Sequence, residues 1–195
     1  MSLVNQDSAF GFRAIGKAGQ NNDNQGLSEY NIAASSDAIY QHDPVQFLAT
    51  GYIGVAATST AVLLGSLNGV FYTDVPDQKP RWANHLAASN TATDIVGFVS
   101  DDPYERFEVQ MDGTLPIANI GLNTDIVYTA GSVANYNSDV ELSSSGVTSA
   151  TAQFRILGVS KDILNKSLAN ATTYAANVNV VGIINEHFLK QSTGI

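Results

Sequence analysis

Residues 95–123, IVGFVSDDPYERFEVQMDGTLPIANIGLN, contain the clearest strand pattern of the chain. Apolar residues alternate with small or polar ones on both sides of an acidic turn, as in FEVQM at 107–111. This period of two is typical of strands with one buried face. Pro103 fixes its own φ and keeps Asp102 out of the helical region. The segment therefore predicts a β-hairpin with an acidic turn.

Further strand-like segments follow one another along the chain, about 8 to 12 residues apart. Residues 38–57 predict strand, turn and strand, and residues 61–74 predict one long strand bent at Gly65 or Gly69. No segment shows a strand, a glycine-rich turn and an amphipathic helix in succession. We therefore predict an all-β fold, with a body that is a β-barrel or a β-sandwich.

The sequence divides into an extended N-terminal arm, residues 1–28, and a β-rich body, residues 29–195. Polar loops are expected near 75–93, 132–150 and 162–176, and the last of them has a weak helical pattern. A chain of 195 residues with 44% hydrophobic residues is long enough and apolar enough for a single domain with its own core.

The arm is rich in Asn, Gln, Gly and Ser, so by itself it cannot bury enough surface to offset its ordering entropy. Phe10, Phe12 and Ile15 nevertheless alternate with small residues. We expect the arm to become ordered on a neighbouring subunit by adding a strand. A flexible leader with incidental apolar residues is the alternative.

The composition narrows the possible partners and compartments. The net charge is −9, and nine acids between residues 91 and 141 face one base, Arg106. A field of this sign repels phosphate backbones, so we expect no nucleic-acid partner. This acidic region could bind a basic partner, or it could only keep the protein soluble. Cysteine is absent, as suits a reducing cytoplasm, and no signal peptide or membrane span is expected.

Residues able to carry catalysis or bind a metal are sparse. The three histidines lie in different segments, and His187 is expected to be a hydrogen-bonded residue at the edge of the body. NNDNQG at 21–26 resembles the start of a calcium loop, but Ile32 stands where the bidentate Glu is required. The acids in 101–105 could form a cation cluster, but a solvated turn, with Asp102 preceding Pro103, is the favoured interpretation. We expect no enzyme activity, no metal and no cofactor.

Arg81 and Trp82 follow Lys79 and Pro80 in the polar segment after the long strand. Trp and Arg dominate binding hot spots, so an exposed Trp82 would be an interface anchor. The alternative is that Trp82 closes one end of a barrel.

Short motifs in order along nearly the whole chain resemble a family of small virion structural proteins of tailed bacteriophages. They are GFRAIGK (11–17), LSEYNI (27–32), HDPV (42–45), LLGSLNGVFYTD (63–74), AQFRILGV (152–159) and INEHF (184–188), together with residues 95–123. Some members of that family are similar to the cement or decoration proteins that sit outside the capsid shell.

The resemblance implies a non-catalytic protein, made in the bacterial cytoplasm, that binds the outer surface of the head and stabilises contacts between capsomers. It implies the major capsid protein as partner and a homo-oligomer, with a trimer as the expected form. Candidate interface residues are Phe10, Phe12, Arg13, Ile15, Lys17, Arg81 and Trp82. The alternatives are another virion component (head fibre, tail or shell protein) and a module that binds glycans of the host surface.

Overall fold

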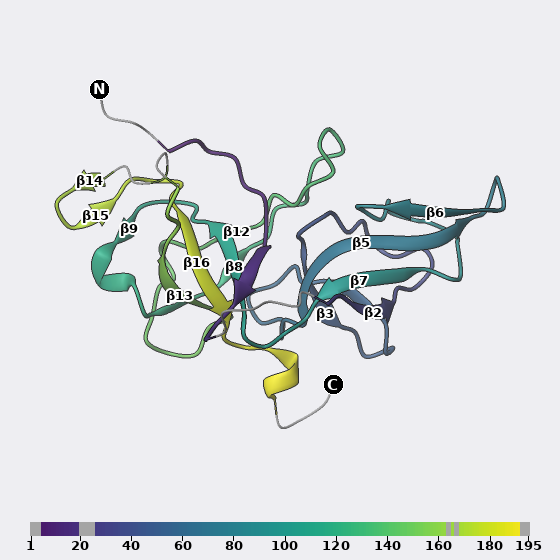
Figure 1. Cartoon of the computed structure of the whole chain (residues 1–195), viewed down its shortest axis with the longest axis horizontal. Coiled ribbons are helices and arrows are strands. Elements are labelled where there is room, and N and C mark those ends of the chain that lie inside the picture. Colours follow the sequence, from purple (N-terminus) through teal and green to yellow (C-terminus); the bar gives the residue numbers. More distant parts are fainter. Residues whose placement is uncertain (1–4, 20–25, 163–164, 166–167, 192–195) are drawn as a thin grey trace.

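The computed structural model describes residues 5–19, 26–162, 165 and 168–191. The described residues form several antiparallel sheets and short 3-10 helices, with no α-helix among them (Figure 1). None of these sheets closes into a barrel. The all-β prediction is confirmed, and the body is sandwich-like.

The first sheet has five strands and is assembled from distant parts of the chain. In spatial order they are β1 (Arg13–Lys17), β8 (Glu105–Gln110), β16 (Asn179–Ile184), β13 (Phe154–Val159) and β10 (Asn123–Thr124). Two smaller sheets are formed by strands that lie between β8 and β16 in the chain. They are β11 (Ile126–Val127) with β12 (Glu141–Leu142), and β14 (Leu168–Asn170) with β15 (Thr173–Tyr174) and β9 (Leu115–Pro116). The 3-10 helices η1 and η3 span Ile117–Asn119 and Phe188–Lys190.

The second sheet is built from the continuous segment between β1 and β8. Its strands are β2 (Ser28–Asn31), β7 (Val96–Ser100), β5 (Gly65–Asp74), β3 (Pro44–Phe47) and β4 (Ile53–Val55), and β6 (Lys79–Ala83) pairs with β5. β5 is the long strand expected within 61–74, and its register shifts between Leu67 and Gly69, close to the predicted bend. The two sheets occupy opposite halves of the molecule along its long axis (Figure 1).

The acidic turn joins the two sheets, and the predicted hairpin is wrong. β7 pairs with β2 and β5, whereas β8 pairs with β1 and β16. Val99 of β7 packs in the core of the second sheet, and Phe107 of β8 packs in the core of the first. The alternation of both runs is real, but alternation identifies a strand without identifying its partner. Asp102 supports the turn, since its Oδ1 accepts the Tyr104 N–H at 2.8 Å.

All three of the expected polar loops contain strands. The segment 75–93 includes β6, the segment 132–150 includes β12, and the described part of 162–176 forms β14 and β15, with no α-helix. Residues 79–83 are nearly all exposed, so no buried face gives β6 a period-two pattern. Pro80 also lacks the N–H of an inner strand, and such a residue is tolerated at an edge.

Two hydrophobic cores lie under the two sheets, and adjacent residues connect them. Leu63 packs in the first core and Leu64 in the second. The Leu63 N–H donates to the Glu186 carbonyl at 3.0 Å, and the Leu64 N–H donates to the Val45 carbonyl at 2.8 Å. At Gly65, a Cβ would lie 2.1 Å from the Ser100 carbonyl oxygen, so only glycine fits there. We call this junction the seam.

Residues 5–19 of the N-terminal segment pack on the body of their own chain, whereas the sequence predicted an arm ordered on a neighbouring subunit. Phe12 is fully buried in the first core, where its ring lies 5.7 Å from Phe107 and 5.4 Å from Phe154. Its backbone also ties it to the seam, because its N–H donates to the His42 carbonyl at 2.8 Å and its carbonyl accepts the Ser66 hydroxyl at 2.7 Å. Phe12 is therefore a core residue of its own chain.

Charged side chains hold β1 against the acidic strand β8. Arg13 pairs with Glu108, and Lys17 pairs with Asp102 at 2.9 Å. The buried Glu105 carboxylate accepts the Gly16 N–H at 3.0 Å. The expected added strand does form, but its partner strand belongs to the same chain.

We predict that Phe12→Ala lowers the free energy of unfolding by about 3–5 kcal/mol, because it leaves a cavity between two aromatic rings. Phe10→Ala is the matched control: Phe10 is half-buried and packs under the Arg13 guanidinium, so a loss of about 1 kcal/mol or less is expected. Urea unfolding of both variants measures the difference. If both variants lose equally little free energy of unfolding, residues 10–12 do not form part of the core and can be regarded as a dispensable arm.

Two titratable groups are buried close to the seam. Asp43 Oδ2 accepts the Tyr40 N–H at 2.7 Å, and burial, with Asp139 as a further negative neighbour, raises the pKa of Asp43 to about 6. His187 Nδ1 accepts the Leu189 N–H at 3.1 Å. Burial, with the nearby Lys190, lowers the pKa of His187 to about 4 despite the opposing charges of neighbouring aspartates. His187 is fully buried, so its expected place at the edge of the body is wrong.

These two groups couple folding to pH with opposite signs. The unfolded chain protonates His187 near its ordinary pKa of 6.5, so the stability from burying the neutral ring is lost as pH falls from 6.5 towards 4. The folded chain retains the Asp43 proton up to about pH 6, so the stability from that proton is lost as pH rises from 3.8 through 6.

We therefore predict that His187→Asn and Asp43→Asn tilt the pH dependence of stability in opposite directions. Each asparagine keeps an acceptor for the local backbone N–H. Relative to the unmodified chain between pH 4 and pH 6, the free energy of unfolding should fall with pH in His187→Asn and rise with pH in Asp43→Asn. Urea titrations at four pH values measure the slopes. Parallel curves for all three proteins would contradict this assignment.

Candidate functional site

A groove of about 500 Å³ opens on the outer face of the first sheet. We call it the Arg106 groove. Its lining comes from β1, β8, β13 and β16 and from the residues after β13: Ile15, Arg106, Leu157, Gly158, Val159, Ser160, Lys161, Asp162 and Val181.

Two β-bulges supply the exposed aliphatic side chains of the groove. The register shifts between Ala14 and Gly16 in β1 and between Ile156 and Gly158 in β13, which leaves Ile15 and Leu157 as the extra residues. At a bulge two residues of one strand lie opposite a single residue of its partner. Ile15 is 43% exposed and Leu157 is 44% exposed, so both bulges present an aliphatic side chain to solvent on one face.

Arg106 lies between these aliphatic groups without a polar partner. Its Nε is buried and makes no hydrogen bond, and no ion pair involves its guanidinium within the described part of the chain. A buried guanidinium N–H without an acceptor costs free energy that a partner carboxylate or carbonyl would recover. The groove therefore combines aliphatic side chains with the unsatisfied Arg106 Nε, and Ser160, Lys161 and Asp162 form its polar part.

The apolar surface continues beyond this groove. A second hollow of about 420 Å³ shares Val159, Ser160 and Lys161 with it and adds Ile117, Leu168 and Tyr174. Ile117 and Leu168 are exposed, as are Ile15 and Leu157. Contiguous exposed aliphatic surface of this kind marks sites of protein association.

The structure separates the candidate residues of the N-terminal segment. Ile15 lines the Arg106 groove, whereas Phe12 is buried in the core. Arg13 pairs with Glu108 and covers the Phe10 ring, with its guanidinium carbon 4.8 Å from the ring centroid. Lys17 is engaged by Asp102. Of this set, Ile15 lines the Arg106 groove, and Lys17 lines a separate hollow beside Asp101 and Asp102.

Arg81 and Trp82 lie on β6, in the opposite half of the molecule from β8, β13 and β16, which contribute to the Arg106 groove (Figure 1). Arg81 faces Asp74, with 3.6 Å between Nη1 and Oδ1. Trp82 is 69% exposed, so it does not close one end of the body. Its ring centroid lies 4.9 Å from those of both Phe71 and Phe98.

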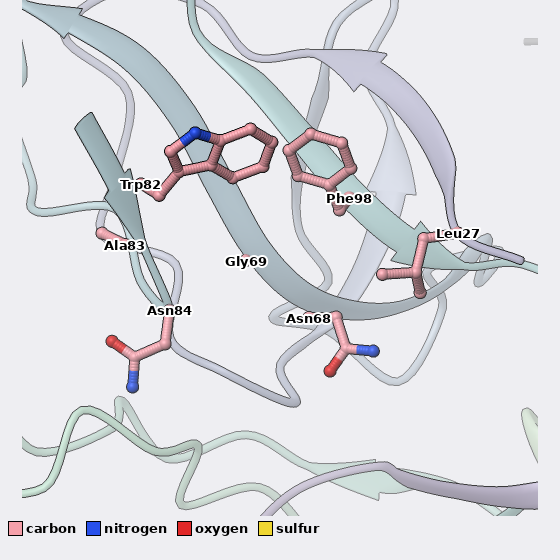
Figure 2. A pocket seen from close by; sticks show the side chains of 7 residues that line it. All are labelled: Leu27, Asn68, Gly69, Trp82, Ala83, Asn84 and Phe98. Atoms are coloured by element: carbon pink, nitrogen blue, oxygen red, sulfur yellow. The ribbon is translucent and has the colours of Figure 1, made fainter. Parts of the chain in front are cut away.

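Trp82 forms one wall of a second site, an open groove of about 460 Å³ that we call the Trp82 groove. Its lining residues are Leu27, Asn68, Gly69, Trp82, Ala83, Asn84 and Phe98. Figure 2 shows the Trp82 and Phe98 rings side by side, with Gly69 between them and the carboxamides of Asn68 and Asn84.

Most acids of the region 91–141 act as hydrogen-bond acceptors within the chain. Seven of the nine accept a hydrogen bond from, or pair with, another residue: Asp94, Asp101, Asp102, Glu105, Glu108, Asp112 and Asp125. Asp101, for example, accepts the Ser28 and Tyr30 hydroxyls at 2.9 and 2.6 Å. The possible cation cluster at 101–105 is thus occupied by internal donors, and these acids stabilise turns and strand pairs.

Neither a metal cluster nor a membrane helix is found in the ranges that the structure describes. No group of three or more His, Asp or Glu side chains there could hold a metal ion. No helix there is long and apolar enough to cross a membrane. The calcium-like loop 21–26 lies outside the described residues except for Gly26.

Several groove residues were not singled out from the sequence. Leu157 and Asn68 owe their positions to bulges, which the sequence marks only through the neighbouring Gly158 and Gly69. Arg106 had a signal of its own, as the single base among nine acids.

No family model matches the chain, and no curated protein or solved structure matches it either.

We predict that Arg106→Met raises the free energy of unfolding by about 1 kcal/mol, since it removes a buried donor that lacks an acceptor. Arg155→Met is the matched control: it removes hydrogen bonds to the Oδ1 atoms of Asn123 and Asn185 at 3.0 and 2.7 Å, so no gain is expected. Thermal and urea unfolding measure both. A loss of stability in Arg106→Met would show that the guanidinium is satisfied within the chain.

Proposed function

We propose that this chain is a non-catalytic cement or decoration protein of a tailed-bacteriophage head, which binds the major capsid protein through the Arg106 groove. The sequence resemblance supplies the class of protein. The observation that carries the proposal is the placement of Ile15 and Leu157, each at a β-bulge, in one groove with Arg106, whose buried Nε has no acceptor.

The chemistry of the groove suits a stable protein contact. Aliphatic side chains supply apolar area, and a desolvated arginine is a frequent hot spot when it meets a carboxylate. The expected capsid surface therefore presents an apolar ridge with an acidic or carbonyl acceptor. Many such contacts repeated over the shell add by multivalency. The homotrimer stays a prediction from the resemblance.

Co-sedimentation with expanded heads that lack this protein tests the proposal. The unmodified chain should bind saturably. Arg106→Glu and Leu157→Asp should each weaken binding at least about tenfold, because each places a carboxylate in the contact. Trp82→Ala is the control, since Trp82 lies outside the groove, and should bind as the unmodified chain does. Deleting residues 1–28 is unsuitable, because it removes β1 and Phe12 from the body.

The outcomes separate the alternatives, once circular dichroism has shown that each variant is folded. Absence of binding by the unmodified chain would overturn the cement role. Binding that survives both groove substitutions would keep the role and reject the Arg106 groove as the contact.

A further inference from the structure

The Trp82 groove has the features of a built site and is separate from the proposed capsid contact. Its shape depends on a third bulge: the register passes from Leu67 opposite Val99 to Gly69 opposite Phe98, with Asn68 as the extra residue. The bulge places the exposed Asn68 and the side-chain-free Gly69 together on the groove. The floor beside the Trp82 ring therefore stays open.

The aromatic wall is held in place by its own packing. The Trp82 and Phe98 rings are stacked, with 26° between their planes, and the Phe71 ring supports Trp82 at 54°. Despite these contacts Trp82 keeps 69% of its surface exposed. An indole that is fixed and yet exposed presents a flat, preorganised face to a ligand.

The polar groups of the groove are neutral. No charged residue lines it, and Arg81 of the same strand faces Asp74. The Asn68 carboxamide makes no hydrogen bond to the described residues, whereas Asn84 Nδ2 donates to Gln41 Oε1 at 3.3 Å. A free carboxamide offers two donor hydrogens and one acceptor oxygen side by side, which matches vicinal hydroxyl groups.

We propose that the Trp82 groove binds a neutral saccharide, with one sugar ring stacked on Trp82 and its hydroxyls hydrogen-bonded by Asn68. The face of a pyranose ring carries C–H groups of partial positive charge, which the negative face of an indole attracts. The volume of about 460 Å³ lies within the range of small-molecule sites. Single-stranded nucleic acid also stacks on aromatic rings, but it requires cations that the lining lacks.

The inference does not depend on the capsid role. A saccharide site and the Arg106 groove lie on different sheets. These sheets occupy opposite halves of the molecule (Figure 1). On a particle bound through the first sheet, the second sheet would be the part available to surface polysaccharides.

The full chain can be tested directly, because Trp82 is its single tryptophan and its fluorescence reports on this groove alone. The probes are neutral oligosaccharides of glucose, galactose, mannose and N-acetylglucosamine, each from one to four units, at up to millimolar concentration. A saturable change in emission is expected for at least one sugar series. Saturation-transfer NMR then compares the variants with the preferred sugar.

Trp82→Ala should abolish the NMR signal, and Asn68→Ala should weaken binding about five- to tenfold, the equivalent of one lost hydrogen bond. Tyr104→Ala is the matched control: it removes another exposed aromatic, which packs against Lys190 outside the groove, and should bind as the unmodified chain does. Arg106→Glu should also bind the sugar normally, so failure of the capsid contact and failure of this site are distinguishable.

Three results would overturn the inference. The first is no emission change with any sugar of the panel, and the second is sugar binding that survives Trp82→Ala. The third is a Trp82 emission change that is caused instead by a proline-rich peptide, by oligothymidine or by rising protein concentration. That result would assign the groove to a peptide, a nucleic acid or a second copy of the chain.

Discussion

The arrangement of this protein depends on one constraint, that two separate cores are filled from consecutive residues. Leu63 and Leu64 point into different cores, and Gly65 follows where no side chain fits against Ser100. Backbone hydrogen bonds fix Leu63 beside the first sheet and Leu64 beside the second, and Phe12 of the first core is bonded across the seam to His42 and Ser66. The grooves on the two sheets therefore belong to one connected frame.

Bulges connect this frame to the two candidate binding sites. Ile15, Leu157 and Asn68 are each the extra residue of a register shift, and each reaches the surface of a groove. Ile15 and Leu157 keep the outward position that strand alternation gives them, and the register shift leaves each without a single residue opposite it. β-Bulges thus contribute both to the surface around Arg106 on one sheet and to the neutral aromatic surface around Trp82 on the other.

The strand content could be predicted from the sequence, but the pairing could not. Alternation identified β7, β8 and the bent β5, because each has one buried face. It did not show that β7 and β8 belong to different sheets, since partner choice depends on contacts distant in sequence. β6 was missed because Pro80 and its exposed neighbours carry no alternation. Of the candidate residues, Ile15 and Trp82 line grooves, whereas Phe12 is required by the core.

The insertion of the second sheet between β1 and β8 has a consequence for biosynthesis. Residues 28–100 contain every strand of that sheet, so it can fold as soon as this segment leaves the ribosome. β1 is synthesised earlier, yet its partner β8 begins only at Glu105, and β16 ends at Ile184. The first strand of the described chain thus finds its partner only after every strand of the second sheet has been made, and closing this long loop slows folding of the first sheet. Until β8 has been made, Phe12 and the apolar side chains of β1 remain unpacked next to the second sheet.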